Sequence, residues 1–154
     1  MTLAPAVTQV QVFQPKEKTV SDKPVIYKTD CKYAESHEWA KQEGDLIVIG
    51  VSDYAQNQLG DVVFVELPAV GKDVQAGKAF GVVESVKAAS DLNAPVSGKV
   101  VANNDKLTND PALVNQDAFG GGWMIKVKPS NAAELTTLLD AATYQKKIEA
   151  GELH

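Results

Sequence analysis

The sequence contains no arginine. All 15 of its basic residues are lysines, and 20 aspartates and glutamates bring the formal net charge to −5. Proteins that bind nucleic acids usually combine a basic surface with arginines that contact bases and phosphates through two hydrogen bonds. The composition therefore argues against a nucleic-acid partner.

Cysteine and histidine are also scarce. The one cysteine, Cys31, excludes an intramolecular disulfide, and His37 and His154 stand far apart with no cysteine near either. Structural zinc sites are built from four such ligands, so we expect no metal site. Only Lys32 adjoins Cys31 as a basic neighbour that would lower the thiol pKa, which favours a bystander over a nucleophile.

Long apolar runs and legible catalytic motifs are missing as well. No run approaches the roughly 18 residues of a membrane-spanning helix. No nucleophile–base pair and no phosphate-binding glycine loop can be read from the sequence. We therefore expect a protein that is not an enzyme and has no membrane partner.

A length of 154 residues suits one domain. Residues 1–28 show no sustained period and contain Pro15 and Pro24, so we expect a mobile N-terminal extension before a domain at 29–154. An added edge strand is the alternative, because the extension also contains Val7, Val10, Val12 and Phe13. Without arginine the extension is a poor mitochondrial presequence, so we expect a cytoplasmic bacterial protein, or a mitochondrial matrix protein if the host is eukaryotic.

The domain is rich in strand signals. Short runs of β-branched and aromatic residues, bounded by glycine or proline, predict strands at 46–49, 62–67, 80–83, 96–101 and 124–128. Four helices are predicted from capping signals: Ser52 and Gly60 around 53–59, Asp110-Pro111 before 112–115, a reciprocal Asn131/Glu134 cap before 132–139, and Asp140 before 141–148. The fold class is mostly β, with Trp39, Phe64, Phe80 and Trp123 expected in the core.

Lys87 lies nearly midway between two glycine turns, ten residues after Gly77 and eleven before Gly98. Its flanks read as strands, so the lysine is expected at the tip of a hairpin. An acylating enzyme needs this geometry, because it must reach the ε-amine without engaging the rest of the domain. The neighbours Val86 and Ala88 add no bulk that would hide the amine.

The motifs around this lysine resemble the biotinyl/lipoyl carrier pattern: Gly71-x-x-Val74-x-x-Gly77, Glu84-Ser85-Val86-Lys87-Ala88 and Pro95-Val96-Ser97-Gly98. The longer string 84–91 is similar to the glycine cleavage system H protein family. So are Ser36-His37-Glu38-Trp39, the segment 59–68 and Gly122-Trp123-Met124. The resemblance covers about residues 32–148, with the motifs in order.

The resemblance implies a flattened β-barrel or sandwich of the biotinyl/lipoyl (barrel-sandwich hybrid) type, with short peripheral and C-terminal helices. Closure of a barrel would remove the sheet edges. It also implies a carrier that bears lipoate, amide-linked to Lys87, and that has no turnover of its own. Glu84 and Gly71 match positions implicated in recognition by the lipoylating enzyme, although Glu84 is equally explained as a surface carboxylate.

Three further positions match the pocket that receives the loaded arm in this family: Ser36, Glu38 and Asp91. Carboxylates there would favour the cationic aminomethyl nitrogen. Simpler roles remain open, since Asp91 also suits a turn and the loop of Ser36 and Glu38 also suits packing of Trp39. Tyr54 stands where many members of the family carry histidine.

The partners implied by the resemblance are glycine decarboxylase (P protein), aminomethyltransferase (T protein), dihydrolipoyl dehydrogenase (L protein) and lipoate-attaching enzymes, acting on a monomer. A biotin carrier is disfavoured, because biotinylated lysines normally lie between methionines. A lipoyl domain of a 2-oxo acid dehydrogenase complex usually shows Asp-Lys-Ala, which is absent here. An H-like lipoyl relay protein that serves lipoate transfer or protein modification outside glycine catabolism stays open.

Overall fold

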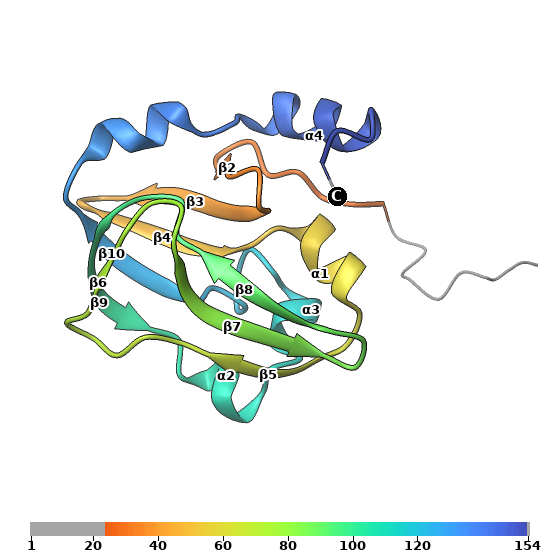
Figure 1. Ribbon diagram of the computed structural model, residues 1–154, viewed down its shortest axis with the longest axis horizontal. Helices are drawn as coiled ribbons and strands as arrows, with labels where there is room; N and C mark the ends of the chain where they lie inside the picture. Colours follow the sequence, from red (N-terminus) through yellow and green to blue (C-terminus); the bar gives the residue numbers. More distant parts are fainter. Residues whose placement is uncertain (1–23, 154) are drawn as a thin grey trace, which may run out of the picture.

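A computed structural model describes residues 24–153, and these form two antiparallel β-sheets with short helices around them (Figure 1). The large sheet has the order β2 (Lys32–Tyr33), β3 (Glu38–Glu43), β4 (Leu46–Val51), β10 (Ile125–Pro129), β9 (Gly98–Asn103) and β6 (Asp73–Val74). The small sheet has the order β5 (Val62–Glu66), β7 (Ala79–Ser85) and β8 (Ala89–Asn93). The expected fold class, mostly β, is confirmed.

The helices lie at the periphery, as the sequence predicted. They are α1 (Asp53–Leu59), α2 (Lys106–Asn109), α3 (Leu113–Gln116), the 3₁₀ helix η1 (Ala132–Thr137) and α4 (Ala141–Glu149). In Figure 1, η1 and α4 run along the top, over β2 and β3, whereas α2 and α3 lie below beside the small sheet. The helices therefore cover the rim of the sandwich and leave the β7–β8 turn open.

Strand β4 connects the two layers of the core, because both of its faces are buried. Ile47, Ile49 and Val51 pack on the inner face of the large sheet and against the small sheet. Val48 faces the opposite side, where it joins a cluster formed by β2, β3 and α4. A strand buried on both faces needs a continuous apolar run rather than an alternating one, and 46–51 has such a run.

Five of the strands match the predicted runs, with ends shifted by at most two residues. Strand β3 was not predicted, because Lys41, Gln42 and Glu43 make its sequence polar. Its antiparallel pairing with β4, from Glu38 opposite Val51 to Glu43 opposite Leu46, decides its structure instead. Pairing with a neighbour thus overrides a weak local propensity.

The expectation that Phe64 lies in the core is wrong: its side chain is 45% exposed. The ladder between β5 and β7 shifts register between Val62 and Phe64, so Val63 is an extra residue on β5. Such a bulge turns the residues after it to the other face of the sheet. Val63 and Phe64 therefore both face outward, while Val62 and Val65 stay buried.

Two capping predictions also need correction. Asp110 is the C-cap of α2, and Ala112, without a side-chain bond, is the N-cap of α3. Asn131 caps η1 as predicted, by accepting from Ala133 N, but Glu134 does not complete a reciprocal cap. Its carboxylate instead accepts from the backbone N–H of Ser97 at 2.7 Å, because the tertiary fold places that free donor within reach.

The caps of α1 and α4 are confirmed. Ser52 Oγ accepts from Ala55 N, and Gly60 follows the last turn of α1 with a φ of 77°. Asp140 accepts from Thr143 N at the start of α4. Both helices begin where their capping residues predict, and α1 ends at the predicted glycine, although its ψ of −157° is not that of a left-handed cap.

Of the two arrangements expected from the resemblance, the sandwich is found, and a closed barrel is not formed by the described residues. The edge strands β6 and β8 approach each other through one isolated bridge, between Ala76 and Ala94. The expectation that closure removes the sheet edges is therefore wrong, since β5 and β8 remain edge strands of the small sheet. The described residues contain no helix long and apolar enough to cross a membrane.

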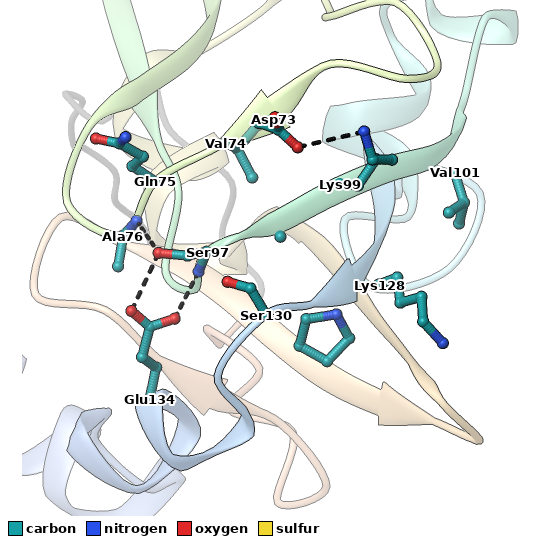
Figure 2. A pocket seen from close by; sticks show the side chains of 12 residues that line it. Asp73, Val74, Gln75, Ala76, Ser97, Lys99, Val101, Lys128, Ser130 and Glu134 are labelled. Atoms are coloured by element: carbon teal, nitrogen blue, oxygen red, sulfur yellow. Dashed lines mark hydrogen bonds and ion pairs between the residues drawn. The ribbon is translucent and has the colours of Figure 1, made fainter.

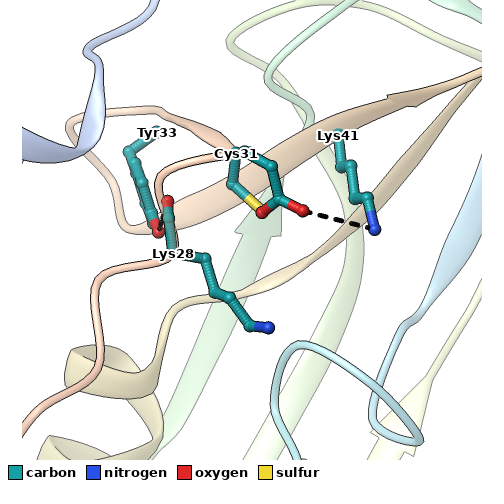
Figure 3. Close-up of polar contacts among 5 residues, drawn as sticks. Lys28, Cys31, Tyr33 and Lys41 are labelled. Carbon is teal, nitrogen blue, oxygen red and sulfur yellow. Dashed lines mark hydrogen bonds and ion pairs between the residues drawn. The ribbon is translucent and has the colours of Figure 1, made fainter.

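The predicted mobile extension, residues 1–28, lies mostly outside the described residues, which begin at Pro24. Within the described part, Ile26 N–H donates to Asp53 Oδ2 at 2.8 Å, and the Tyr33 hydroxyl donates to Lys28 O at 2.9 Å (Figure 3). Residues 26–28 thus lie against α1 and β2.

Cys31 lies beside this segment and is buried (Figure 3). Burial, with a smaller contribution from the neighbouring Asp30, raises the pKa of its thiol to about 12. The thiol is therefore protonated at neutral pH, which fits the expected bystander.

Packing between Trp39 and Gly50, which face each other across the β3–β4 ladder, gives the first testable prediction. A Cβ at Gly50 would lie 2.7 Å from Trp39 Cζ2, and the indole is held in place by its bond to Ala118 O. We expect Gly50→Ala to lower the free energy of unfolding by about 1–3 kcal/mol through overpacking. Urea denaturation measures it.

Gly121→Ala is the control, because a Cβ there would make an ordinary 3.6 Å contact with Leu113. We expect its urea midpoint to stay near the wild-type value. Equal midpoints for Gly50→Ala and the wild type would show that the indole can move aside.

Candidate functional site

The turn between β7 and β8 consists of three residues, Val86, Lys87 and Ala88, and lies at the edge of the molecule beside the C-terminal end of α1 (Figure 1). Among the described non-glycine residues a positive φ occurs at His37, so none of the turn residues has one. Turns of types I′, II′ and II need a positive φ at a central residue, so this turn is none of them. The predicted hairpin tip is confirmed.

Ser85 builds this turn with its side chain. Its Oγ accepts from the backbone N–H groups of Lys87 and Ala88, at 3.1 and 3.2 Å. Ser85 N–H in turn donates to Ala88 O at 2.8 Å. Serine is favoured at the first position of a type I turn for this kind of bond, a signal that was readable from the sequence.

The surface around Lys87 combines apolar and acidic side chains. Val63, Phe64 and Val86 are exposed, and Val86 is 69% exposed. Exposed carboxylates flank them on the same strands and at the corner before β5, namely Asp61, Glu66 and Glu84. We call these six residues the tip surface; it presents an apolar centre with negative charge around it.

The structure separates the two residues assigned to recognition by the lipoylating enzyme. Glu84 lies on β7, three residues before Lys87, opposite Phe64 and Ala89. Gly71 lies two residues before β6, at the end of the molecule away from the β7–β8 turn, and its N–H donates to Val100 O. Only Glu84 is therefore placed with Lys87.

Ser36 and Glu38 are brought together at the start of β3. Ser36 Oγ donates to Glu38 Oε1, and Asn93 N–H of β8 donates to Glu38 Oε2 at 2.8 Å. The Glu38 carboxyl is 2% exposed and thus links the large sheet to the small one from a buried position. Asn93, which supplies this link, was not identified from the sequence.

Burial raises the pKa of Glu38 from its ordinary value of 4.5 to about 7, while the hydrogen bonds from Ser36 and Asn93 act in the opposite direction. The expected role for this residue assumed a fixed negative charge. Instead, the carboxyl is divided between its neutral and charged forms near neutral pH.

Asp91 lies on β8 opposite Val82, two residues before Asn93, and its side chain is exposed. Residues two apart on a strand share a face, so Asp91 and Asn93 lie on the same side of β8. In the described part of the chain no hydrogen bond joins Asp91 to Ser36 or Glu38. The three expected pocket residues are therefore a hydrogen-bonded pair, of which Glu38 is buried and Ser36 is exposed, and one exposed carboxylate on a neighbouring strand.

His37, which lies between Ser36 and Glu38 in the chain, is held by a contact with α4. Its Nδ1 lies 2.8 Å from the hydroxyl of Tyr144, and that hydroxyl lies 2.7 Å from Ser52 Oγ. The backbone of His37 has a φ of 84°, and its ring lies 5.2 Å from that of Tyr54. These contacts give His37 a structural role and place Tyr54, the departure from the family pattern, beside it.

A hollow of about 760 Å³ lies at the other end of the sandwich, between β6, β9 and the segment after β10 (Figure 2). Most of its charged side chains form an ion pair or hydrogen bonds with other residues that line it. Lys99 pairs with Asp73 at 3.6 Å, and Glu134 binds Ser97 through both carboxylate oxygens. None of the residues predicted to form the functional site lines this hollow, although Val74, Ser97 and Gly98 of the carrier motifs do. Among the described residues there is also no cluster of His, Cys, Asp and Glu that could hold a metal.

A two-sheet β domain that presents one lysine on a short, exposed turn defines a carrier domain of the biotinyl/lipoyl type. The chain belongs to the glycine cleavage H-protein family, whose profile matches residues 31–151. The predicted resemblance is thereby confirmed.

Named relatives agree with this assignment. The glycine cleavage system H protein of Carboxydothermus hydrogenoformans is 58% identical over 120 residues, which cover 78% of this chain and 92% of the relative. The mitochondrial glycine cleavage system H protein of Oryza sativa subsp. indica is 55% identical over 123 residues, covering 80% and 75%. The crystal structure of a glycine cleavage system H protein from Mycobacterium marinum is similar with a TM-score of 0.73 and 39% identity, over 79% of this chain and 98% of that one.

The raised pKa of Glu38 predicts how stability depends on pH. Because the folded carboxyl binds its proton up to about pH 7 and the unfolded one only up to about 4.5, the folded state holds more protons between these values. The free energy of unfolding should therefore fall as the pH rises through this interval, by about 3 kcal/mol in total, and stay level above it.

Glu38→Gln removes this titration and keeps an acceptor for Asn93 N–H. We expect the variant to match the wild type near pH 5 and to exceed it in stability near pH 8, in urea titrations across this range. Glu35→Gln, at an exposed carboxylate of the same loop, controls for the lost charge. A difference between Glu38→Gln and the wild type that is constant with pH would contradict the prediction.

Proposed function

We propose that this protein is the lipoyl-bearing carrier of the glycine cleavage system, with lipoate joined by an amide bond to Lys87. In this role it takes the aminomethyl group of glycine from the decarboxylase to the aminomethyltransferase, and its dithiol to dihydrolipoyl dehydrogenase. The observation that carries the proposal is the exposed Lys87 on a turn built by Ser85, in a chain that belongs to the glycine cleavage H-protein family.

The residues at the turn fit the group. An amide bond to lipoate requires an exposed primary amine, and Lys87 is exposed between two residues without bulky polar side chains, Val86 and Ala88. The dithiolane, when bound, supplies the redox and carbon-carrying chemistry. We infer that the protein itself is a non-catalytic carrier that holds and presents the arm.

The proposed arm pocket contains Ser36, Glu38 and Asp91. Asp91 offers an exposed negative charge, whereas Glu38 offers a buried carboxyl with a pKa of about 7. A cation that approached the pair would favour the ionised form of Glu38, since opposite charges stabilise each other. At neutral pH little free energy separates the two forms, so Glu38 would release its proton when a cationic group binds and take it up when the group leaves.

The tip surface supports contacts with the partners proposed from the sequence: glycine decarboxylase, aminomethyltransferase, dihydrolipoyl dehydrogenase and lipoate-attaching enzymes. Its apolar centre of Val63, Phe64 and Val86 provides area that becomes buried on contact. The surrounding carboxylates, Glu84 among them, would steer basic partner surfaces toward Lys87. We propose a monomer that acts in the bacterial cytoplasm, or in the mitochondrial matrix if the host is eukaryotic.

The test is the mass of the protein from its native host. We expect one added lipoyl group, located at Lys87 by peptide mapping, and complete loss of that group in Lys87→Arg, because a guanidinium does not form the amide. Lys78→Arg, at an exposed lysine just before the same strand, should keep it.

Loading of the lipoylated protein by glycine decarboxylase and glycine separates the carrier from a lipoyl relay protein outside glycine catabolism. Lipoate on another lysine, or undiminished lipoylation of Lys87→Arg, would overturn the assignment of the site. Lipoylation at Lys87 without loading would favour the relay protein.

A further inference from the structure

The turn that carries Lys87 is bonded to a different part of the chain. Val86 N–H donates to the carbonyl of Asp61 at 3.0 Å. Asp61 lies between Gly60, which ends α1, and Val62, which begins β5. We call residues 60–62 the corner. Together with the pairing of Val62 and Ser85 across the β5–β7 ladder, this bond ties the tip of the hairpin to the corner.

One side chain holds the corner on both sides of Asp61. Asn115 of α3 donates from Nδ2 to Gly60 O at 2.8 Å, and its Oδ1 accepts from Val62 N–H at 2.9 Å. Nδ2 also donates to Gln56 Oε1 of α1 at 3.0 Å. An amide side chain has two donors and one acceptor oxygen, and here the donors and the acceptor are all engaged.

Gly60 also contributes to the placement of the lysine. A Cβ at this residue would lie 3.1 Å from Lys87 Cε, so the lysine side chain lies over the glycine. The backbone of Gly60 has a φ of 77° and a ψ of −157°, a region that is essentially restricted to glycine. The backbone therefore requires glycine here, and a Cβ would displace the Lys87 side chain from its position over the residue.

We propose that Asn115 and Gly60 are positioning residues for the carrier lysine. Asn115 fixes the corner, the corner fixes the turn through Asp61 and Val86, and Gly60 leaves the space in which the Lys87 side chain lies. Holding the lysine in few orientations lowers the entropy that a modifying enzyme must remove when it binds the tip. The proposal rests on the proposed role of Lys87 as the lipoyl attachment site.

A purely structural role for Asn115 would predict a loss of stability and nothing more. A matched residue separates the two roles: Asn104 is a buried asparagine whose Nδ2 donates to Gly121 O at 2.9 Å and Trp123 O at 2.7 Å. It fixes another loop and has no bond to the corner. Asn115→Asp and Asn104→Asp are therefore the same chemical change. The first affects a residue that binds the corner, and the second affects a residue that does not.

The first measurement is amide hydrogen exchange at Val86 in the full chain. In Asn115→Asp the carboxylate still accepts from Val62 N–H but no longer donates to Gly60 O. We expect exchange at Val86 to become about tenfold faster or more, as for the loss of a buried hydrogen bond, and to stay near the wild-type rate in Asn104→Asp. An unchanged rate in Asn115→Asp, or equal increases in both variants, would overturn the role of Asn115.

The second measurement compares Gly60→Ala with Gly151→Ala. Both glycines have nearly the same φ, 77° and 76°, but a Cβ at Gly151 has no atom within 4 Å. Both substitutions therefore place a Cβ on a residue with a positive φ, and only Gly60→Ala occupies the space beneath Lys87. With a lipoate-attaching enzyme, we expect kcat/KM to fall roughly tenfold to hundredfold for Gly60→Ala and to stay near wild type for Gly151→Ala.

The ¹³Cε chemical shift of Lys87 in unmodified protein gives a readout that does not need the enzyme, and it should change in Gly60→Ala alone. Unchanged shift and unchanged kcat/KM would overturn the role of Gly60. If the enzyme modified no lysine at all in the wild type, the proposed function would fail. The exchange rate and the chemical shift would still decide whether the two residues position Lys87.

Discussion

Strand β4 is buried on both faces, and its neighbours depend on that burial. Ile49 lies on the inner face of the large sheet, whereas Val48 and Gly50 face the layer of Trp39 and α4. Pairing with β4 holds the polar segment β3 in a strand. It thereby places Glu38, the first residue of β3, near β8. The end of β4 leads directly into Ser52, which caps α1, and α1 ends at the corner that holds the Lys87 turn.

The Lys87 turn and Glu38, which are both positioned through β4, differ in their exposure to solvent. The Lys87 turn is exposed, yet its backbone is bonded to Ser85 and to Asp61, so a solvent-exposed side chain projects from a fixed backbone. Glu38 is buried, and its charge changes near neutral pH while its position stays fixed by Ser36 and Asn93. In the proposed function, the first property would let partner enzymes reach the arm, and the second would let Glu38 release a bound cationic group.

Much of the fold could be predicted from local signals. The runs at β4 and β5, the cap at Ser52 and the glycine after α1 each specify a local backbone conformation, and the structure contains them. The position of Lys87 at a hairpin tip was also predictable, because spacing between turns decides which residue stands at the end. Phe64 was not, since a register shift in a bulge depends on the partner strand and not on the sequence of β5 alone.

The sequence by itself determined the class of the domain, the helix and strand positions marked by caps and apolar runs, and the lysine at the turn, because these follow from interactions between residues close in the chain. Only the tertiary structure decided that Asn115 holds the corner, that Glu134 serves Ser97 and that Glu38 is buried enough to raise its pKa. Each of these depends on groups 37 to 55 residues apart in the chain that packing brings within hydrogen-bond distance. The local sequence pattern does not identify such partners. Any polar side chain of suitable length would give the same local pattern before the chain folds.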